Sequence, residues 1–361
     1  MLDTQSLGLL VRQTWMPLDV AFRFKSRLLA YAFARTCRSA RQRYGIISSF
    51  PVTINYYYMY LCSQNPETTM ITFPIAKINL GLNVVEKRPD GYHNLETVFY
   101  PVPIRDALEV VAMDPAFPAP ADCDLKVTAA AAVPAGSPAV PAPSPFDTGD
   151  EQRNLVVRAY NALKADYPAL PRCHAHLYKA IPTQAGMGGG SSDCAYMIRL
   201  LNEMFALQLS EQQQMQYAAR LGADCAFFIK SRPCYAEGIG EQLQDISLDL
   251  SGWHIAVVRP DIPVPTKEAF ARIRPHYPAK NCRQVVMQPV ETWRDELVND
   301  FEESVFALHP EIGHVKEQLY NMGATYAAMS GSGSALFGLF RNCPDRLSQE
   351  FPRMFTFSSL L

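Results

Sequence analysis

A glycine-rich stretch from Pro182 to Asp193 has the composition of a loop that binds an anion and then turns into a helix. Glycines let the backbone approach an anion closely, and the first turn of a helix presents free N–H groups at the positive end of its dipole. Ser191 and Ser192 stand near the end of the stretch, and their hydroxyls could cap the helix or bind phosphate or its Mg²⁺. The pattern predicts a nucleotide phosphate site, although such a loop on its own is about as often purely structural.

Two familiar phosphate-binding patterns do not fit this loop. A Walker A loop closes with Gly-Lys-Ser/Thr, which is missing here, and the dinucleotide fingerprint needs a third glycine where Ser191 stands. Apolar residues from Ala175 to Ile181 indicate a short strand before the loop, and those from Ala195 to Phe205 have helical spacing after it. The expected arrangement is therefore strand, loop and helix, which suits an anion site.

A carboxylate and a lysine, Asp224 and Lys77, form a second candidate. Asp224 follows a helix whose start is marked by the capping box at Ser210 to Gln213, and it precedes the apolar run 225–229. Lys77 lies in a segment where apolar and polar residues alternate with the period of a strand. The plainer interpretations are a helix-capping acid and a solvated lysine. The chemical one is a general base whose proton affinity depends on burial and on Lys77 as a cationic neighbour.

Two turns bring further polar and aromatic residues into play. Arg88 to Gly91 is a turn by composition and leads to Tyr92 and His93. In the plainer interpretation the tyrosine packs on the protein and the imidazole lies at the surface. In the functional one the pair stacks on and hydrogen-bonds a base. Met329 to Ser334 is a second Gly/Ser turn between two expected strands. Its backbone N–H groups could close over bound phosphates.

These stretches together resemble a known group of enzymes. Three motifs of the GHMP small-molecule kinase superfamily are matched in order along the chain, at Pro182–Ser192, Gly222–Asp224 and Met329–Ser334. Within that superfamily, Ala76–Leu82 and Arg88–Thr97 resemble the signature of the kinases that act on 4-diphosphocytidyl-2-C-methyl-D-erythritol. The resemblance covers Met70 to about Phe340, and motifs in the correct order make it specific.

The resemblance implies an α+β class and the two-domain GHMP kinase fold. An N-terminal domain like ribosomal protein S5 is expected over 70–235, and a C-terminal ferredoxin-like α/β domain over 236–361, with a cleft between them. The implied reaction is phosphorylation of the 2-hydroxyl of the cytidylated substrate by ATP with Mg²⁺, in the non-mevalonate isoprenoid route. No residue is assigned as a metal ligand.

The resemblance also implies roles for individual residues. Asp224 matches the catalytic aspartate that accepts the hydroxyl proton, and Lys77 its partner lysine. On the substrate side, Tyr92 is expected to stack on cytosine, His93 to hydrogen-bond it, and Phe270 to cover its other face. Asn79 and Thr266 also match substrate-side positions, with Thr266 near the catalytic pair. The implied ATP-binding residues are Pro182, Thr183, Gln184, Ala185, Gly186, Met187, Gly188, Gly189, Gly190, Ser191 and Ser192.

Two departures and two rival functions qualify this reading. Gln184 stands where the family has a small residue, and Cys225-Ala226 replaces the usual apolar residue and proline after the aspartate, although no reacting group is lost. Another GHMP kinase, for mevalonate, homoserine or a sugar, should lack both the Asp90-to-His93 run and the Pro-Thr-x-x-x-Phe stretch from Pro265 to Phe270. A non-catalytic ligand-binding relative should lack Lys77 or Asp224, and both are present.

Bulk composition excludes several classes of protein. The chain of 361 residues is 48% hydrophobic, enough for sizeable cores and two domains. A net charge of −2 argues against a nucleic-acid partner, and the absence of a long apolar run argues against a membrane one. The nine scattered cysteines suggest reduced thiols rather than zinc or disulfides. A cytoplasmic monomer or homodimer that binds a small molecule is expected.

Two segments are expected to carry no chemistry. Residues 1–69 hold eight basic and three acidic residues, a net charge of +5 that is typical of an organelle transit peptide. We favour a start codon assigned too early, because Met70 stands directly before the first strand-like run; a transit peptide would instead mean a plastid-type organelle. Residues 114–145 are rich in proline and alanine and predict an extended surface insertion.

Overall fold

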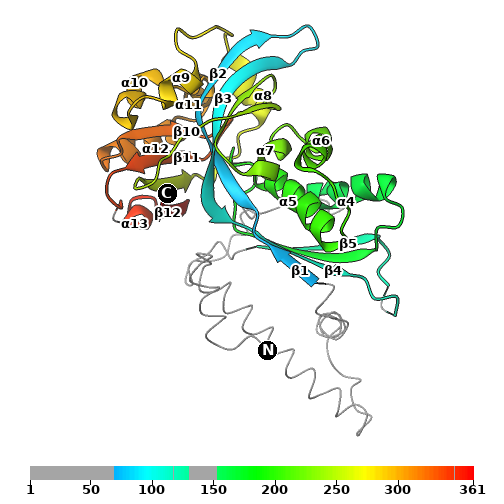
Figure 1. Cartoon of the computed structure of the whole chain (residues 1–361). Coiled ribbons are helices and arrows are strands. Elements are labelled where there is room, and N and C mark those ends of the chain that lie inside the picture. Colours follow the sequence, from blue (N-terminus) through cyan, green and yellow to red (C-terminus); the bar gives the residue numbers. More distant parts are fainter. Residues whose placement is uncertain (1–68, 117, 130–152, 345) are drawn as a thin grey trace. The chain divides into compact units, whose positions relative to one another are not determined.

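The computed structural model describes residues 69–116, 118–129, 153–344 and 346–361 (Figure 1). They fall into two compact units. Of the described residues, one unit holds 69–70, 109–116, 118–124 and 171–175, and the other holds 71–108, 125–129, 153–170, 176–344 and 346–361. Every predicted site residue belongs to the second, larger unit. The predicted extension lies outside the described residues except for Thr69, and so does the part of the predicted insertion from 130 onward.

A long hairpin carries the lysine side of the predicted site. Strands β2 (Ile75–Lys87) and β3 (His93–Arg105) pair antiparallel and are the two long neighbouring arrows of Figure 1. The predicted turn joins them, and the Gly91 N–H donates to the Arg88 carbonyl at 3.1 Å. Strands β7 (Cys234–Glu237) and β8 (Gln242–Asp245) extend the sheet in the order β2-β3-β7-β8.

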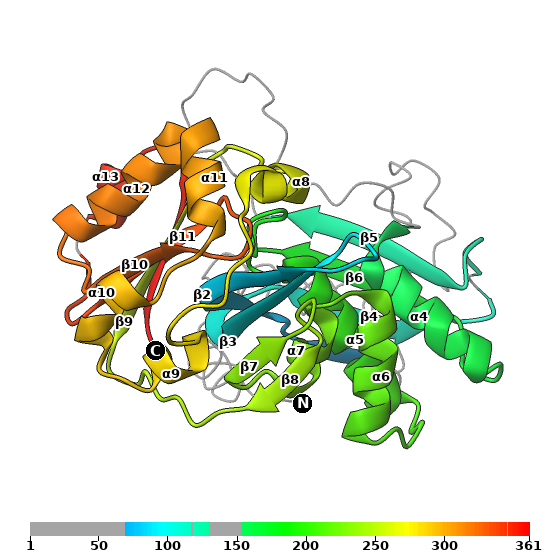
Figure 2. The ribbon, with the colours of Figure 1, turned by 90° about the horizontal axis from the view of Figure 1, so that it is seen from above.

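A second sheet forms the C-terminal part of the larger unit. Its order is β10-β11-β9-β12, with all neighbours antiparallel, and its strands are β9 (His254–Arg259), β10 (Tyr326–Met329), β11 (Leu336–Phe340) and β12 (Phe355–Leu360). Helix α12 (Pro310–Asn321) packs against β10 and β11, beside α11 (Phe301–Leu308) (Figure 2). One apolar core joins the two sheets, because Ile78 and Leu80 of β2 belong to the same buried cluster as Ile255 and Phe337.

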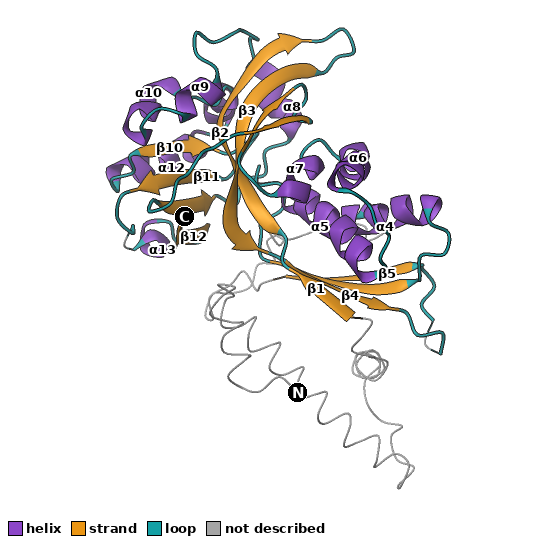
Figure 3. Cartoon of the chain, in the orientation of Figure 1, coloured by secondary structure: helices purple, strands orange, loops and turns teal. Residues whose placement is uncertain are grey.

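Four helices surround the glycine-rich loop in sequence. They are α4 (Leu155–Asp166), α5 (Gly189–Met204), α6 (Glu211–Leu221) and α7 (Cys225–Lys230), and they pack on one another (Figure 3). Asn154 caps α4 by accepting from the Val156 N–H, and the predicted capping box of Ser210 and Gln213 is present at α6. Every helix among the described residues is too short or too polar to span a lipid bilayer.

A third sheet corrects the prediction for residues 114–145. Its order is β1-β4-β6-β5, made of β1 (Thr69–Thr72), β4 (Ala107–Ala112), β6 (Cys173–Lys179) and β5 (Cys123–Ala129). Strand β5 lies inside the segment expected to be an irregular insertion. The misleading signal was the proline content on either side, since Cys123 and Leu125 are buried and alternate with more exposed polar residues as a strand requires.

Short elements complete the described chain. The stretch from Pro265 to Phe270 contains the one-turn helix α8, and Phe270 begins the 3₁₀ turn η3 that follows it directly. The short elements are α8 (Thr266–Ala269), η3 (Phe270–Arg272), α9 (Cys282–Val286), η4 (Val290–Thr292), α10 (Trp293–Glu296) and α13 (Leu347–Glu350).

Candidate active site

The glycine-rich loop has the geometry of an anion cradle. It joins the end of β6 to Gly189, the first residue of α5, and Gly188 precedes the helix with a φ of 69° that an L side chain rarely adopts. The Ser192 N–H donates to the Gly188 carbonyl at 2.8 Å, so the helical hydrogen bonds begin there. The N–H groups before it, from Gly189 to Ser191, have no acceptor within the helix and lie at the positive end of its dipole. Phosphate oxygens are the natural ligands for such a turn.

The loop is held from behind by residues far away in sequence. A Cβ atom on Gly188 would lie 2.7 Å from the Phe228 ring and 3.3 Å from Cε of Lys77, and the Lys77 N–H donates to the Met187 carbonyl at 3.1 Å. A Cβ atom on Gly186 would lie 1.9 Å from the Ser330 carbonyl oxygen. Glycine is therefore required at both positions, because any side chain would clash. Gly188 lets Lys77 of β2 pack against the loop, and Gly186 does the same for the second Gly/Ser turn.

Lys77 and Asp224 form an ion pair beside this loop. Lys77 Nζ lies 3.3 Å from Asp224 Oδ2, and the lysine side chain is 4% exposed whereas the aspartate side chain is 32% exposed. Lys77 Nζ also donates to Asn79 Oδ1 at 2.6 Å and lies 4.9 Å from the centre of the Phe99 ring. The buried ammonium is thus compensated on several sides. The carboxylate, in contrast, remains within reach of a substrate.

Asn79 is engaged on both ends of its amide. Its oxygen accepts from Lys77, and its Nδ2 donates to Thr97 Oγ1 at 3.0 Å. The Asn79 backbone N–H donates to Ser330 Oγ at 3.2 Å, and that hydroxyl donates to the Gly186 carbonyl at 2.9 Å. The structure therefore places Asn79 next to the lysine and links it to both glycine-containing loops, while its predicted contact with substrate stays a prediction.

One supporting residue gave no signal in the sequence. Asn299 Nδ2 donates to the carbonyl oxygens of Met329 and Gly331, at 2.7 and 2.9 Å, and its side chain is buried. These two hydrogen bonds hold the backbone of the second Gly/Ser turn in place. Asn299 lies in no motif and two positions before Phe301, the first residue of α11, so only the tertiary contact reveals its role.

The predicted base-binding residues are only partly brought together. The rings of His93 and Phe270 are stacked, with centroids 4.7 Å apart and planes at 22°, and Phe301 packs edge-on against Phe270 at 4.8 Å. Burial, and secondarily the charge of Lys87, lowers the pKa of His93 below its ordinary value, which favours a neutral imidazole that both donates and accepts. Tyr92 is 62% exposed, and Thr266 is exposed at the start of α8. The Phe270 face that His93 covers is closed to a base in this arrangement.

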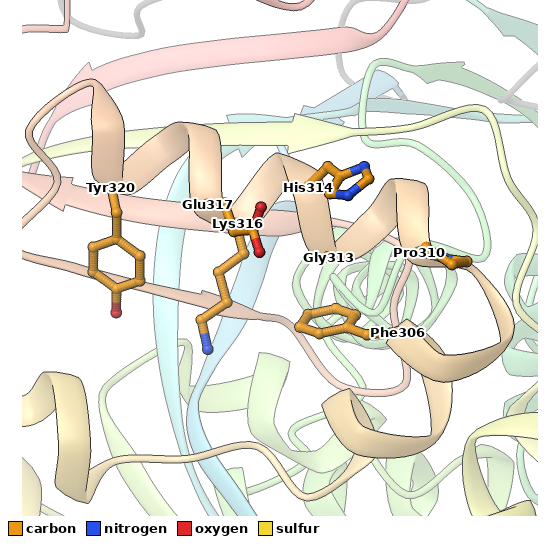
Figure 4. Close-up of a pocket in the computed structure, with 7 residues that line it drawn as sticks. All are labelled: Phe306, Pro310, Gly313, His314, Lys316, Glu317 and Tyr320. Atoms are coloured by element: carbon orange, nitrogen blue, oxygen red, sulfur yellow. The ribbon is translucent and has the colours of Figure 1, made fainter.

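A surface cavity lies elsewhere on the larger unit. It has a volume of about 360 Å³ and is lined by Phe306, Pro310, Gly313, His314, Lys316, Glu317 and Tyr320 (Figure 4). All of these residues belong to α11 and α12, so the cavity is separate from the Lys77–Asp224 pair and from the glycine-rich loop.

Comparison with known proteins identifies the family. The model described as "GHMP kinases N terminal domain" matches residues 154–232, and that described as "GHMP kinases C terminal" matches 286–355. The chain is 47% identical over 293 residues to a protein of Bacteroides fragilis named 4-diphosphocytidyl-2-C-methyl-D-erythritol kinase, covering 81% of this chain and 100% of that protein. A protein of the same name from Bacteroides thetaiotaomicron is 50% identical over 271 residues, covering 75% and 92%.

Solved structures agree with the sequence comparison. A crystal structure of 4-(cytidine 5'-diphospho)-2C-methyl-D-erythritol kinase matches with a TM-score of 0.63 and 27% identity, covering 80% of this chain and 98% of that one. A homoserine kinase from Cytophaga hutchinsonii matches with a TM-score of 0.55 at 12% identity, which speaks for the fold alone. The predicted GHMP kinase fold and the predicted kinase class are thereby confirmed. With relatives this similar over nearly their whole length, the chain belongs to the 4-diphosphocytidyl-2-C-methyl-D-erythritol kinase family of the GHMP kinases.

Proposed function

We propose that the chain uses ATP to phosphorylate the 2-hydroxyl of 4-diphosphocytidyl-2-C-methyl-D-erythritol, a step of the non-mevalonate isoprenoid route. The names of relatives that are 47% and 50% identical support this substrate. The observation that carries the chemistry is the ion pair of Lys77 and Asp224, which lies beside a helix N-terminus suited to phosphate.

In this proposal Asp224 accepts the proton of the substrate hydroxyl. Its carboxylate is the exposed member of the pair, and the buried Lys77 holds it in place and offers positive charge to the transferred phosphoryl group. Asn79 orients the ammonium through its 2.6 Å hydrogen bond. Phosphoryl transfer depends mainly on positioning and charge stabilisation, so these groups and the loop N–H groups suffice on the protein side.

The chain's donor set fits a magnesium ion that is held mainly by the nucleotide. Bound Mg²⁺ would neutralise charge on the phosphate oxygens. Among the described residues, no group of three or more His, Cys, Asp or Glu side chains could hold a metal by itself. Within the same residues Ser192 Oγ is buried at the start of α5 and has no hydrogen-bond partner, which makes it the candidate protein oxygen.

The decisive assay uses the purified protein with Mg–ATP. We expect ADP release with the cytidylated substrate and at most background release with mevalonate or homoserine, the substrates of the rival GHMP kinases. Turnover of one of these in place of the cytidylated substrate would exclude the proposal. Absence of turnover with all three would instead favour a ligand-binding relative.

Tyr92 provides a test of the substrate side. Changing Tyr92 to alanine should raise KM for the cytidylated substrate roughly tenfold, because stacking of a base on an aromatic ring contributes about 1–3 kcal/mol. KM for ATP and the melting temperature should stay unchanged, since the ring is mostly exposed. Tyr277→Ala is the matched control, because Tyr277 is 74% exposed and lies outside the predicted site. Equal KM values for the two variants would contradict the role of Tyr92.

The protein's surroundings are also part of the proposal. We propose that it acts in the cytoplasm as a monomer or homodimer, with small molecules and neither nucleic acid nor membrane as partners. The bacterial source of the relatives and the net charge of −2 support this. Gel filtration coupled to light scattering would give the oligomeric state directly.

A further inference from the structure

A buried ion cluster that the proposed chemistry does not use lies under the glycine-rich loop. It consists of Lys179, Asp106 and Asp193, which are 0%, 1% and 2% exposed. Lys179 Nζ donates to Asp106 Oδ2 and, at 2.7 Å, to Asp193 Oδ2. A single ammonium thus joins two carboxylates from different parts of the chain. We call these residues the Lys179 cluster.

Asp106 connects this cluster to the entry of the loop. Its second oxygen, Oδ1, accepts the backbone N–H groups of Ala180 at 2.5 Å and Ile181 at 2.8 Å. These two residues follow the end of β6 and directly precede Pro182, where the loop begins. The carboxylate therefore fixes the direction in which the chain leaves the strand.

Lys179 and Asp193 connect the cluster to the exit of the loop. A Cβ atom on Gly189 would lie 3.3 Å from Lys179 Nζ and 3.0 Å from a side-chain carbon of Ile181, so the ammonium lies directly against the first residue of α5. Asp193 lies on α5 just after its first turn. Both ends of the loop are thus tied to the same ammonium, one through Asp106 and the other through Asp193.

The energetics favour a role in positioning over one in stability. Burying ionisable groups costs desolvation energy that offsets much of their attraction, so apolar residues of similar volume would stabilise the fold about as well. Burial raises the pKa of Asp193 well above its ordinary value, which favours a neutral side chain that still accepts from Lys179. Asp193 Oδ1 has no hydrogen-bond partner within the described part of the chain. An asparagine at this position would therefore preserve the acceptor.

We propose that Lys179 and Asp193 are positioning residues for the nucleotide, which hold the first turn of α5 so that its free N–H groups meet the phosphates. The inference rests on the proposed function in taking the loop as the ATP site. It extends that function to buried residues that lie against the ends of the loop.

The test measures binding of two ligands to the full chain by calorimetry. Asp193→Ala should weaken binding of Mg–ADP about tenfold, the effect expected from losing one charge-assisted hydrogen bond, whereas Asp193→Asn should weaken it by less than about threefold. Binding of the cytidylated substrate should stay within about twofold in both variants, because its predicted contacts lie outside the first turn of α5. A general loss of folded protein would instead weaken the binding of both ligands. If Asp193→Ala does not fold, Asp193→Leu has the same branching of heavy atoms without an acceptor and should raise the Kd for Mg–ADP by the same factor.

Leu319→Ala is the control for stability. Leu319 is fully buried in the core around α12, so its truncation should lower the melting temperature without changing the affinity for Mg–ADP. The inference would be overturned if Asp193→Ala kept its affinity for Mg–ADP, or if Asp193→Asn lost as much affinity as Asp193→Ala. Neither result would affect the proposed function. Wild-type protein that does not bind Mg–ADP would overturn the proposed function and this inference with it.

Discussion

Replacing Asp224 with asparagine is expected to lower kcat by about 10²- to 10⁴-fold, the usual contribution of a general base. An amide has nearly the shape of the carboxylate but cannot take up the proton of the substrate hydroxyl. Lys77 Nζ also donates to Asn79 Oδ1 at 2.6 Å, so the ammonium should stay in place when the carboxylate is removed. KM for ATP should therefore change little. The measurement is steady-state ADP release at saturating concentrations of both substrates.

The fold should tolerate this substitution. Asp224 precedes α7, but its side chain makes no capping hydrogen bond in the described structure, and it is 32% exposed. Asp245→Asn is the matched control, because Asp245 is also paired with a lysine, Lys230, at 3.0 Å and is 51% exposed. We expect wild-type kcat from the control. An Asp224→Asn enzyme that retains more than about a tenth of the wild-type kcat would show that the carboxylate is not the base.

The features that could be predicted from the sequence depend on neighbouring residues. The capping box of Ser210 and Gln213, the turn from Arg88 to Gly91 and the start of α5 after the glycine-rich loop are set by residue types within a few positions. The two strands around the second Gly/Ser turn were predictable for the same reason. Local patterns of this kind determine where elements begin and end, and thus where Asp224 and the loop stand along the chain.

The features that could not be predicted depend on contacts across the sequence. Alternation in β2 predicted one polar face, yet Lys77 and Asn79 on that face are buried by Phe99, Thr97 and the second Gly/Ser turn. Periodicity reports which residues share a face but not what covers it.

The same limit hid the Lys179 cluster. The strand predicted from Ala175 to Ile181 includes Lys179, but its partner Asp106 is 73 positions away. A pairing between residues so far apart in sequence leaves no local pattern. A lysine is also rarely buried, so its residue type predicts an exposed side chain. Only the fold shows that the strand end lies against Asp106 and the first turn of α5.

The second large effect is expected at Gly186, where alanine should abolish nucleotide binding and destabilise the fold. The residue has a φ of 73°, which costs an L residue about 1–2 kcal/mol, and its new Cβ would lie 1.9 Å from the Ser330 carbonyl oxygen. The obstacle is backbone, so the loops must move apart and the 2.9 Å bond from Ser330 Oγ to the Gly186 carbonyl is lost. We expect kcat/KM for ATP to fall at least about 100-fold, because a 1 Å misplacement of catalytic groups has that effect.

Gly252→Ala separates the clash from the cost of the backbone conformation. Gly252 has a φ of 85°, and a Cβ atom there would meet nothing within 4 Å, so its alanine variant pays only the conformational cost. The control should lose about 1–2 kcal/mol of unfolding free energy in urea and keep full activity, whereas Gly186→Ala should lose more and be inactive. If both variants bound Mg–ADP equally well, the close contact between the two glycine-containing loops would not be needed for nucleotide binding. Ser330 would then have no role beyond the turn in which it lies.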